Sequence, residues 1–300
     1  MIDLHIHTNY SDGTCSVEEI LREAEEKKLE CISITDHDTC LAYRDLKDQN
    51  IRKLFSGKII IGCELKSIVE GTVIEILGYN VDPEMINREI EKIEPTYEQI
   101  NMHEVNTLYE IITKKGYKIE RDKIKFNPKN ESGQRAICNE LLRHPENRKF
   151  REETNYQDEF IFYREHISNP NSPYFVDNSP LIPNPDVVID LIKRAGGLAF
   201  IPHTFIYGEN SMKVFHALTE THKVDGIECY YSKFTPEQIQ FLLDFCKKNH
   251  YYISGGSDYH GTYKPNISMG TGTNNDLNIP MEITRNWAKY KFEIDMSQER

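Results

Sequence analysis

The sequence predicts an α/β fold: a mostly parallel sheet, most simply closed into a barrel, with an inserted and mainly helical subdomain. Short apolar segments rich in isoleucine and valine alternate with helical patterns along much of the 300 residues. This rhythm is typical of parallel strands joined by helices. Several of the apolar segments end in histidine, aspartate or glutamate. This alternation of strand and helix patterns is absent between residues 83 and 175, which indicates an inserted subdomain.

Each expected element has a local signal. Ser16 and Glu19 form a capping-box pattern before the first helix, and apolar residues follow with helical spacing. Further helices of the α/β part are expected at 185–195, 211–222 and 235–249. The expected strands are the apolar segments 1–7, 30–38, 58–65, 72–79, 197–203, 225–231 and 251–261.

The insertion has a different pattern. Residues 84–115 are predicted to be helical and polar, with a break at Pro95, and a second helix is expected at 133–144. A segment rich in proline and asparagine, 169–185, then leads back to the sheet. The sequence therefore predicts a barrel domain at 1–82 and 176–300 and a helical subdomain at 83–175.

Composition narrows the class of protein. The 36 basic and 48 acidic residues give a formal net charge of −12, which argues against a protein that holds long nucleic acid on a basic face. A small phosphorylated substrate stays compatible, because bound cations can reverse the field inside a pocket. The oligomeric state is left open.

The lack of a recognisable targeting signal and the pattern of cysteines predict the cellular compartment. The sequence has no signal-peptide pattern and no apolar run of membrane-spanning length, so no membrane partner is expected. The seven cysteines are scattered without a C-x-x-C pair. A reduced, cytoplasmic protein is therefore expected.

Polar residues at the strand ends favour a closed barrel over an open sheet. A barrel places its chemistry at the carboxyl ends of many strands, whereas an open sheet binds its ligand at one switch point. Most of the predicted strands end in such residues, which are His5, His7, Asp36, His37, Glu64, His203, Asp258 and His260.

The first strand suggests a metal site. His5 and His7 are two residues apart, so their side chains share one face and can bind one ion. The Ser-Asp-Gly turn can fold Asp12 back over the strand end. For this motif alone, two hydrogen-bonded structural histidines explain the spacing equally well. The other strand ends favour a mixed imidazole and carboxylate site, which suits zinc, manganese or iron.

Five motifs together resemble the PHP (polymerase and histidinol phosphatase) family over nearly the whole chain outside the insertion. They are DLHIHTNYSDG, ITDHDT, IGCEL, IPHTF and GGSDYHG. The segments LGYNVD, SPYFVDN and DGIECYYSKFTPEQ are similar to a branch of PHP phosphoesterases that has a helical insertion. Because that branch acts on nucleoside 3′,5′-bisphosphates and short 5′-phosphorylated oligoribonucleotides, the resemblance implies a nucleotide substrate.

The resemblance also implies a distorted (β/α)7-type barrel with two or three divalent ions, manganese being favoured over zinc and iron. The implied ligands of three sites are, in order, His5, His7, Glu64 and Asp258; Glu64 and His203; and Asp12, His37 and His260. The branch usually has a histidine where this chain has Glu75, which is either an oxygen ligand of the second site or no ligand. Asp36 is expected to orient a histidine or to cap the next helix, and Glu228 to hydrogen-bond inside the barrel mouth.

The expected reaction is hydrolysis of a phosphate monoester by attack of a metal-bound hydroxide. The substrate would be AMP, a nucleoside 3′,5′-bisphosphate or a short 5′-phosphorylated oligonucleotide. His203 and His260 are the expected catalytic residues, since a protonated imidazole can steady the departing alkoxide. Arg135, Lys233 and Tyr231 are expected to bind the substrate, with an ordinary surface position as the alternative for each.

Two rival functions remain open. A histidinol-phosphate phosphatase would use the same metal ligands, but members with that activity generally lack this insertion pattern. A non-catalytic PHP module would serve as a structural or partner-binding unit, and Glu75 is the feature that favours it.

Overall fold

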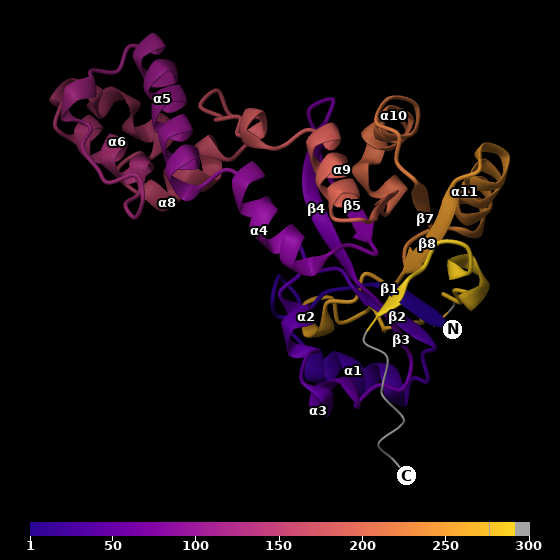
Figure 1. Cartoon of the computed structure of the whole chain (residues 1–300). Coiled ribbons are helices and arrows are strands. Elements are labelled where there is room, and N and C mark those ends of the chain that lie inside the picture. Colours follow the sequence, from indigo (N-terminus) through magenta and orange to yellow (C-terminus); the bar gives the residue numbers. More distant parts are fainter. Residues whose placement is uncertain (276, 292–300) are drawn as a thin grey trace. The chain divides into compact units, whose positions relative to one another are not determined.

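The computed structural model describes residues 1–275 and 277–291, which form two compact units (Figure 1). The sheet unit comprises Met1–Ile93 and Pro183–Arg300, and the helical unit comprises Glu94–Ile182. The helix α4 (Pro83–Ile93) packs on α9 (Pro185–Arg194) and so lies in the sheet unit. The predicted domain boundaries, at 83 and 175, stay a prediction.

The first sheet contains the N-terminal strands. Its strands are, in order, β1 (Ile2–Ile6), β2 (Cys31–Ile34), β3 (Lys58–Ile60) and β9 (Tyr290–Lys291). β1, β2 and β3 are parallel, as predicted, and β9 is antiparallel to β3. The connecting helix α1 (Val17–Glu26) begins at the predicted capping box, where Ser16 Oγ accepts the Glu19 N–H.

The second sheet departs from the predicted parallel pattern. Its strands are, in order, β4 (Gly62–Val69), β5 (Thr72–Tyr79), β6 (Leu198–Ile201), β7 (Gly226–Tyr231) and β8 (Tyr252–Gly256). β6, β7 and β8 are parallel, but β5 is antiparallel to both β4 and β6. The reason is the two-residue turn Glu70-Gly71, in which both residues have positive φ, because such a turn folds β4 and β5 into a hairpin.

Two isolated bridges link the two sheets. An isolated parallel bridge joins Ile6 to Tyr259, and another joins His37 to Glu64. Their bonds include His7 N–H to Tyr259 O at 2.9 Å and Asp38 N–H to Glu64 O at 2.9 Å. The described strands therefore form a mixed α/β fold of two linked sheets, and the closed seven-stranded barrel stays a prediction.

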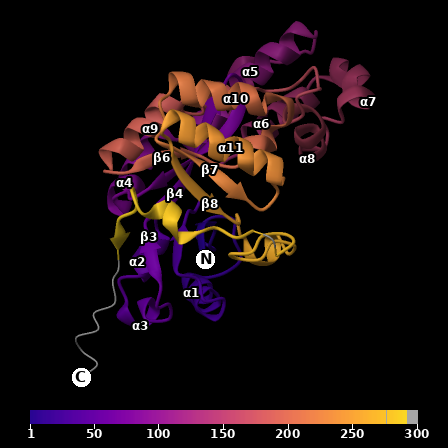
Figure 2. The ribbon, with the colours of Figure 1, turned by 90° about the vertical axis from the view of Figure 1, so that its right-hand side faces the viewer.

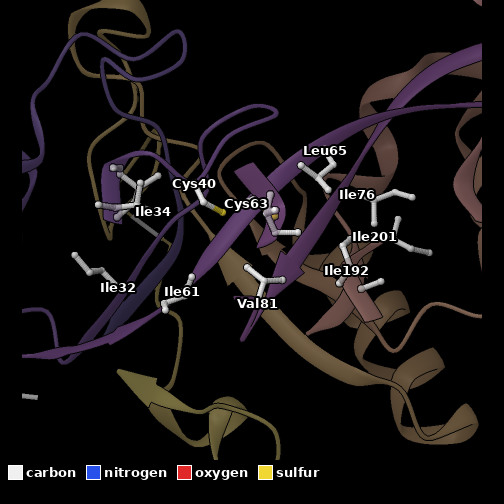
Figure 3. Close-up of a cluster of buried hydrophobic side chains, with 14 of the residues drawn as sticks. Ile32, Ile34, Cys40, Ile61, Cys63, Leu65, Ile76, Val81, Ile192 and Ile201 are labelled. Carbon is white, nitrogen blue, oxygen red and sulfur yellow. The ribbon is translucent and has the colours of Figure 1, made fainter. Parts of the chain in front are cut away.

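The remaining helices of the sheet unit surround these strands, with α9 and α11 packed beside the second sheet (Figure 2). They include α2 (Ala42–Asp45), α3 (Gln49–Arg52), α10 (Ser211–His216) and α11 (Pro236–Asn249). Figure 3 shows the core between β4, β5, β6 and α9, where Leu65, Ile76, Ile192 and Ile201 are almost fully buried. Burial of each such side chain stabilises the fold by about 1.5–3 kcal/mol and so helps to hold the strands in position.

The helical unit has its own core. Its helices are α5 (Tyr97–Lys114), α6 (Gly133–Leu142), α7 (Arg151–Thr154) and α8 (Glu159–Phe162). The predicted break at Pro95 is confirmed, because α4 ends at Ile93 and α5 begins at Tyr97 with a capping box at Thr96. Val105, Leu108 and Ile137 are among its buried residues. Within the described residues, no helix of either unit is long and apolar enough to cross a membrane.

Candidate metal centre

A buried carboxylate lies at the middle of the predicted ligand set. Glu64 stands near the start of β4, where the bridge to His37 links the two sheets, and its side chain is 1% exposed. Its Oε2 lies 3.2 Å from His5 Nε2, 3.2 Å from His7 Nε2 and 3.3 Å from His37 Nδ1. Its Oε1 lies 2.9 Å from His203 Nε2. One carboxylate thus contacts four imidazoles from three separate parts of the chain.

Among the described residues of the sheet unit, three groups of donor atoms are close enough to hold metal ions. Within each group the donor atoms lie within 4.8 Å of one another. The groups are His5, His7 and Glu64; Glu64, Glu75 and His203; and His7, Asp12, His37 and His260. The structure therefore brings these predicted ligands together, with Glu64 and His7 each shared by two groups.

Asp258 adjoins the same cluster from the end of β8. Its Oδ1 lies 3.5 Å from His7 Nε2 and 3.7 Å from His5 Nε2. Asp258 has a backbone φ of 60° and His203 a φ of 25°. Such left-handed backbone is strained for residues other than glycine and persists where the surroundings hold it in place.

The cluster has donor atoms that lack protein partners. In the described part of the chain, both ring nitrogens of His7 and the Nε2 of His260 are buried without a hydrogen bond. His7 Nε2 is near Glu64 but not aligned for a bond. Because an unpaired buried polar atom is unfavourable, these nitrogens indicate a missing partner. A set of imidazoles and carboxylates at this spacing fits divalent zinc, manganese or iron.

The charge states of His7 and Glu64 are consistent with this interpretation, but that of His5 is not, because its neighbouring carboxylates favour the protonated form. Burial lowers the pKa of His7 to about 3, so this imidazole is neutral, as a metal ligand must be. Burial would also lower the pKa of His5, but the carboxylates of Glu64 and Glu228 outweigh it and hold that pKa well above its usual value. Burial would raise the pKa of Glu64, but His5 and the other imidazoles hold it well below its usual value.

Glu228 supports two of the candidate ligands, as the expected hydrogen-bonding role requires. Its Oε1 lies 2.9 Å from His5 Nδ1, and its Oε2 accepts the His203 backbone N–H at 2.7 Å. The carboxylate on Nδ1 leaves His5 Nε2 directed at Glu64. Such outer contacts orient metal-binding imidazoles.

Asp36 plays neither of the two roles expected for it. Its carboxylate accepts the Thr8 N–H and Thr8 Oγ1–H, each at 2.7 Å, and the Ser11 Oγ–H at 2.6 Å. Asp36 therefore holds the loop that carries Asp12, rather than orienting a histidine or capping a helix. The sequence did not show this because the path of that loop depends on tertiary contacts.

Two residues that lie near the cluster were not predicted from the sequence. Tyr207 donates its hydroxyl to Glu75 Oε2 at 3.1 Å and lies 3.4 Å from His203 Nδ1. Lys264 donates to Asp258 Oδ2 at 2.7 Å. Both come from irregular or short 3-10 segments, which have no periodic pattern that could have revealed them.

The three predicted substrate-binding residues lie in different settings. Tyr231 is buried and donates its hydroxyl to Asp258 Oδ2 at 2.9 Å, so the alternative of a surface position is wrong for it. Lys233 is exposed just beyond β7. Arg135 belongs to the helical unit, where its Nε donates to Glu159 Oε2 at 2.7 Å. Binding of substrate by these residues stays a prediction.

This combination of a mixed α/β fold and a cluster of buried histidines and carboxylates defines a metal-dependent hydrolase. The family model of the PHP domain matches residues 3–153, and the chain belongs to this family. It is a metal-dependent phosphoesterase.

Two curated relatives match most of the chain. The 5′-3′ exoribonuclease Rnm of Escherichia coli (strain K12) is 24% identical over 264 residues, which cover 86% of this chain and 84% of the relative. A 5′-3′ exoribonuclease of Haemophilus influenzae is 24% identical over 261 residues, which cover 86% and 89%.

A solved structure supports the fold assignment. A candidate metal-dependent phosphoesterase from Bifidobacterium adolescentis superposes with a TM-score of 0.57 at 20% identity, covering 95% of this chain and 94% of that one. At this identity the likeness concerns the fold alone.

Proposed function

We propose that this phosphoesterase acts on the 5′-phosphorylated end of small nucleotides: AMP, a nucleoside 3′,5′-bisphosphate or a short oligoribonucleotide. The observation that carries the proposal is the shared carboxylate of Glu64, which lies between His5, His7, His37 and His203. The exoribonuclease relatives, which match 86% of the chain, support a substrate of the nucleotide class. The net charge of −12 favours a short substrate over long RNA.

The proposed ion-holding residues are the three donor groups together with Asp258. Glu64 would join the His5–His7 site to the Glu75–His203 site, and the group around Asp12 would hold a third ion. Divalent ions bound there would offset the charge of the phosphate and lower the pKa of a water molecule. The mixed nitrogen and oxygen donors suit manganese, zinc and iron, and we propose manganese first because the resemblance to the PHP branch favours it.

The protein's own side chains would position the phosphate and protonate the leaving group. Tyr231 and Lys264 place a hydroxyl and an ammonium on Asp258, so both donors lie where phosphate oxygens would approach. The leaving-group oxygen would be steadied by an ion held at His203 or His260 or, where that imidazole holds no ion, by its protonated form. The backbone bond from His203 to Glu228 fixes the position of the first of these.

The cysteines bear on the cellular compartment of the protein. All seven are free, and Cys229 and Cys246 form no disulfide although their sulfurs lie 3.5 Å apart. We therefore propose a reducing, cytoplasmic location.

Substrate profiling tests the proposal. Purified protein loaded with Mn²⁺ would be assayed against AMP, a nucleoside 3′,5′-bisphosphate, a 5′-phosphorylated trinucleotide, histidinol phosphate and an aryl phosphate. A trinucleotide with a 5′-hydroxyl is the matched control for end recognition. We expect turnover of at least one 5′-phosphorylated nucleotide and little turnover of histidinol phosphate. Preference for histidinol phosphate, or no nucleotide turnover after metal loading, would contradict the proposal.

A further inference from the structure

A fourth group of metal-type donors lies in the helical unit and shares no residue with the centre that contains Glu64. Its members are Glu120, Glu140 and His144, and one donor atom from each lies within 4.8 Å of the others. Glu140 is in α6, His144 follows the end of that helix, and Glu120 comes from the segment between α5 and α6. The proposed phosphoesterase chemistry does not use these residues.

The Glu140 carboxylate is buried and incompletely paired. It is 2% exposed, and its Oε1 lies 2.8 Å from His144 Nε2. Its Oε2 is buried and has no hydrogen bond in the described part of the chain. Arg143 Nη1 lies 3.7 Å from Oε2, but this side chain is 67% exposed. A distant and solvated guanidinium compensates a buried carboxylate only weakly.

A buried asparagine fixes the scaffold around these donors. Asn147, 1% exposed, accepts the Lys118 N–H at 2.8 Å and donates to Lys118 O at 2.7 Å. It also donates to Leu141 O at 3.0 Å. These bonds hold the segment that leads to Glu120 against the end of α6. The three donors are therefore held close by the fold itself, as a metal site requires.

We propose that Glu120, Glu140 and His144 bind a zinc-class divalent ion that joins the segment before α6 to the end of α6. One imidazole and two carboxylates match the ligands of zinc, with water completing the four-coordinate shell. Calcium is a poorer match, because it takes six to eight oxygen ligands. The ion would give the Glu140 carboxylate a closer counter-charge than Arg143 and would stabilise the helical unit.

The experiment counts bound ions in the full chain. Wild-type protein and a Glu120→Gln, His144→Gln double variant would be stripped with a chelator and dialysed against buffered free Zn²⁺. Ions per chain are then measured by mass spectrometry, with the thermal unfolding midpoint recorded with and without Zn²⁺. We expect the wild-type chain to bind one more ion than the double variant and to gain thermal stability that the variant does not gain.

Matched controls keep the result specific. The Glu146→Gln, His166→Gln double variant makes the same chemical changes in the same unit and should retain the extra ion. The single Glu120→Gln change is at an exposed residue, where a substitution usually disturbs folding little, and we expect it to weaken the extra site about tenfold or more. If wild-type, double-variant and Glu120→Gln chains bind the same number of ions with the same affinity, the cluster is an ordinary ion pair and the proposal is wrong.

Discussion

Glu228 Oε1 lies 2.9 Å from His5 Nδ1, while the other oxygen of the same carboxylate accepts the His203 backbone N–H. A single residue of β7 thus orients two candidate ligands, His5 on β1 of the first sheet and His203 just after β6 of the second. Because it touches the far side of His5 and the backbone of His203, its effect on any bound ion is indirect.

We therefore expect Glu228→Ala to lower Mn²⁺ affinity about 10- to 100-fold, which is the usual effect of losing an outer partner of a ligand. Glu228→Gln keeps the size of the side chain and one acceptor, so it should lose less. Equilibrium dialysis with Mn²⁺ measures the affinity, and circular dichroism checks the fold. Unchanged affinity in Glu228→Ala would mean that His5 needs no orienting partner.

His7 is the sharpest test of direct ligation, because both its ring nitrogens are buried without a hydrogen bond in the described residues. We expect His7→Asn to reduce hydrolysis about 100-fold or more, since a direct ligand should matter at least as much as an outer partner. The matched control is His216→Asn, at an exposed histidine paired with Glu220. Equal rates for the two variants would count against ligation by His7.

Whether Glu75 binds an ion determines the composition of the donor group that also contains Glu64 and His203. Its carboxylate shares that group with Glu64 and His203, and Tyr207 donates a hydrogen bond to it. We expect Glu75→Ala to bind one ion fewer per chain than the wild type and Tyr207→Phe to keep the full number. An unchanged ion count in Glu75→Ala would show that this glutamate is no ligand.

The core that holds the second sheet predicts a stability effect. Ile192 of α9 is fully buried beside Ile76 and Ile201 (Figure 3). We expect Ile192→Ala to lower the free energy of unfolding by about 2–5 kcal/mol. Val187→Ala, at a partly exposed position of the same helix, should cost about 1 kcal/mol or less.

Trp287 gives the measurement for this prediction. It is the single tryptophan, and its indole N–H donates to Ile253 O at 3.0 Å, so its fluorescence reports on the sheet unit. Denaturant titrations of the two variants then compare one residue in the core with one outside it. Equal midpoints would contradict the packing described for α9.

Some of the candidate ligands could be predicted because local patterns place them. His5 and His7 share a face through strand periodicity. Asp258 and His260 have the same spacing, but both follow the end of β8 and Asp258 has a positive φ, so strand periodicity does not place them. The capping boxes at Ser16 and Thr96 mark helix starts that depend only on neighbouring residues.

Other features depend on contacts between distant segments and were missed. The Glu70-Gly71 turn was a local signal for the β4–β5 hairpin, but the pairing of β5 with β6 joins segments more than a hundred residues apart. Asp36 binds the loop after β1, and Lys264 reaches Asp258 from an irregular segment. No periodicity encodes such contacts.

The most direct test of the account is a metal titration of the stripped enzyme. We expect chelation to abolish nucleotide hydrolysis and added Mn²⁺ to restore it, in proportion to the ions regained by the wild-type chain. The His7→Asn chain should regain fewer ions than the wild type and recover about a hundredth of the activity or less. Full turnover by a preparation that contains no metal and is insensitive to chelators would contradict the central claim.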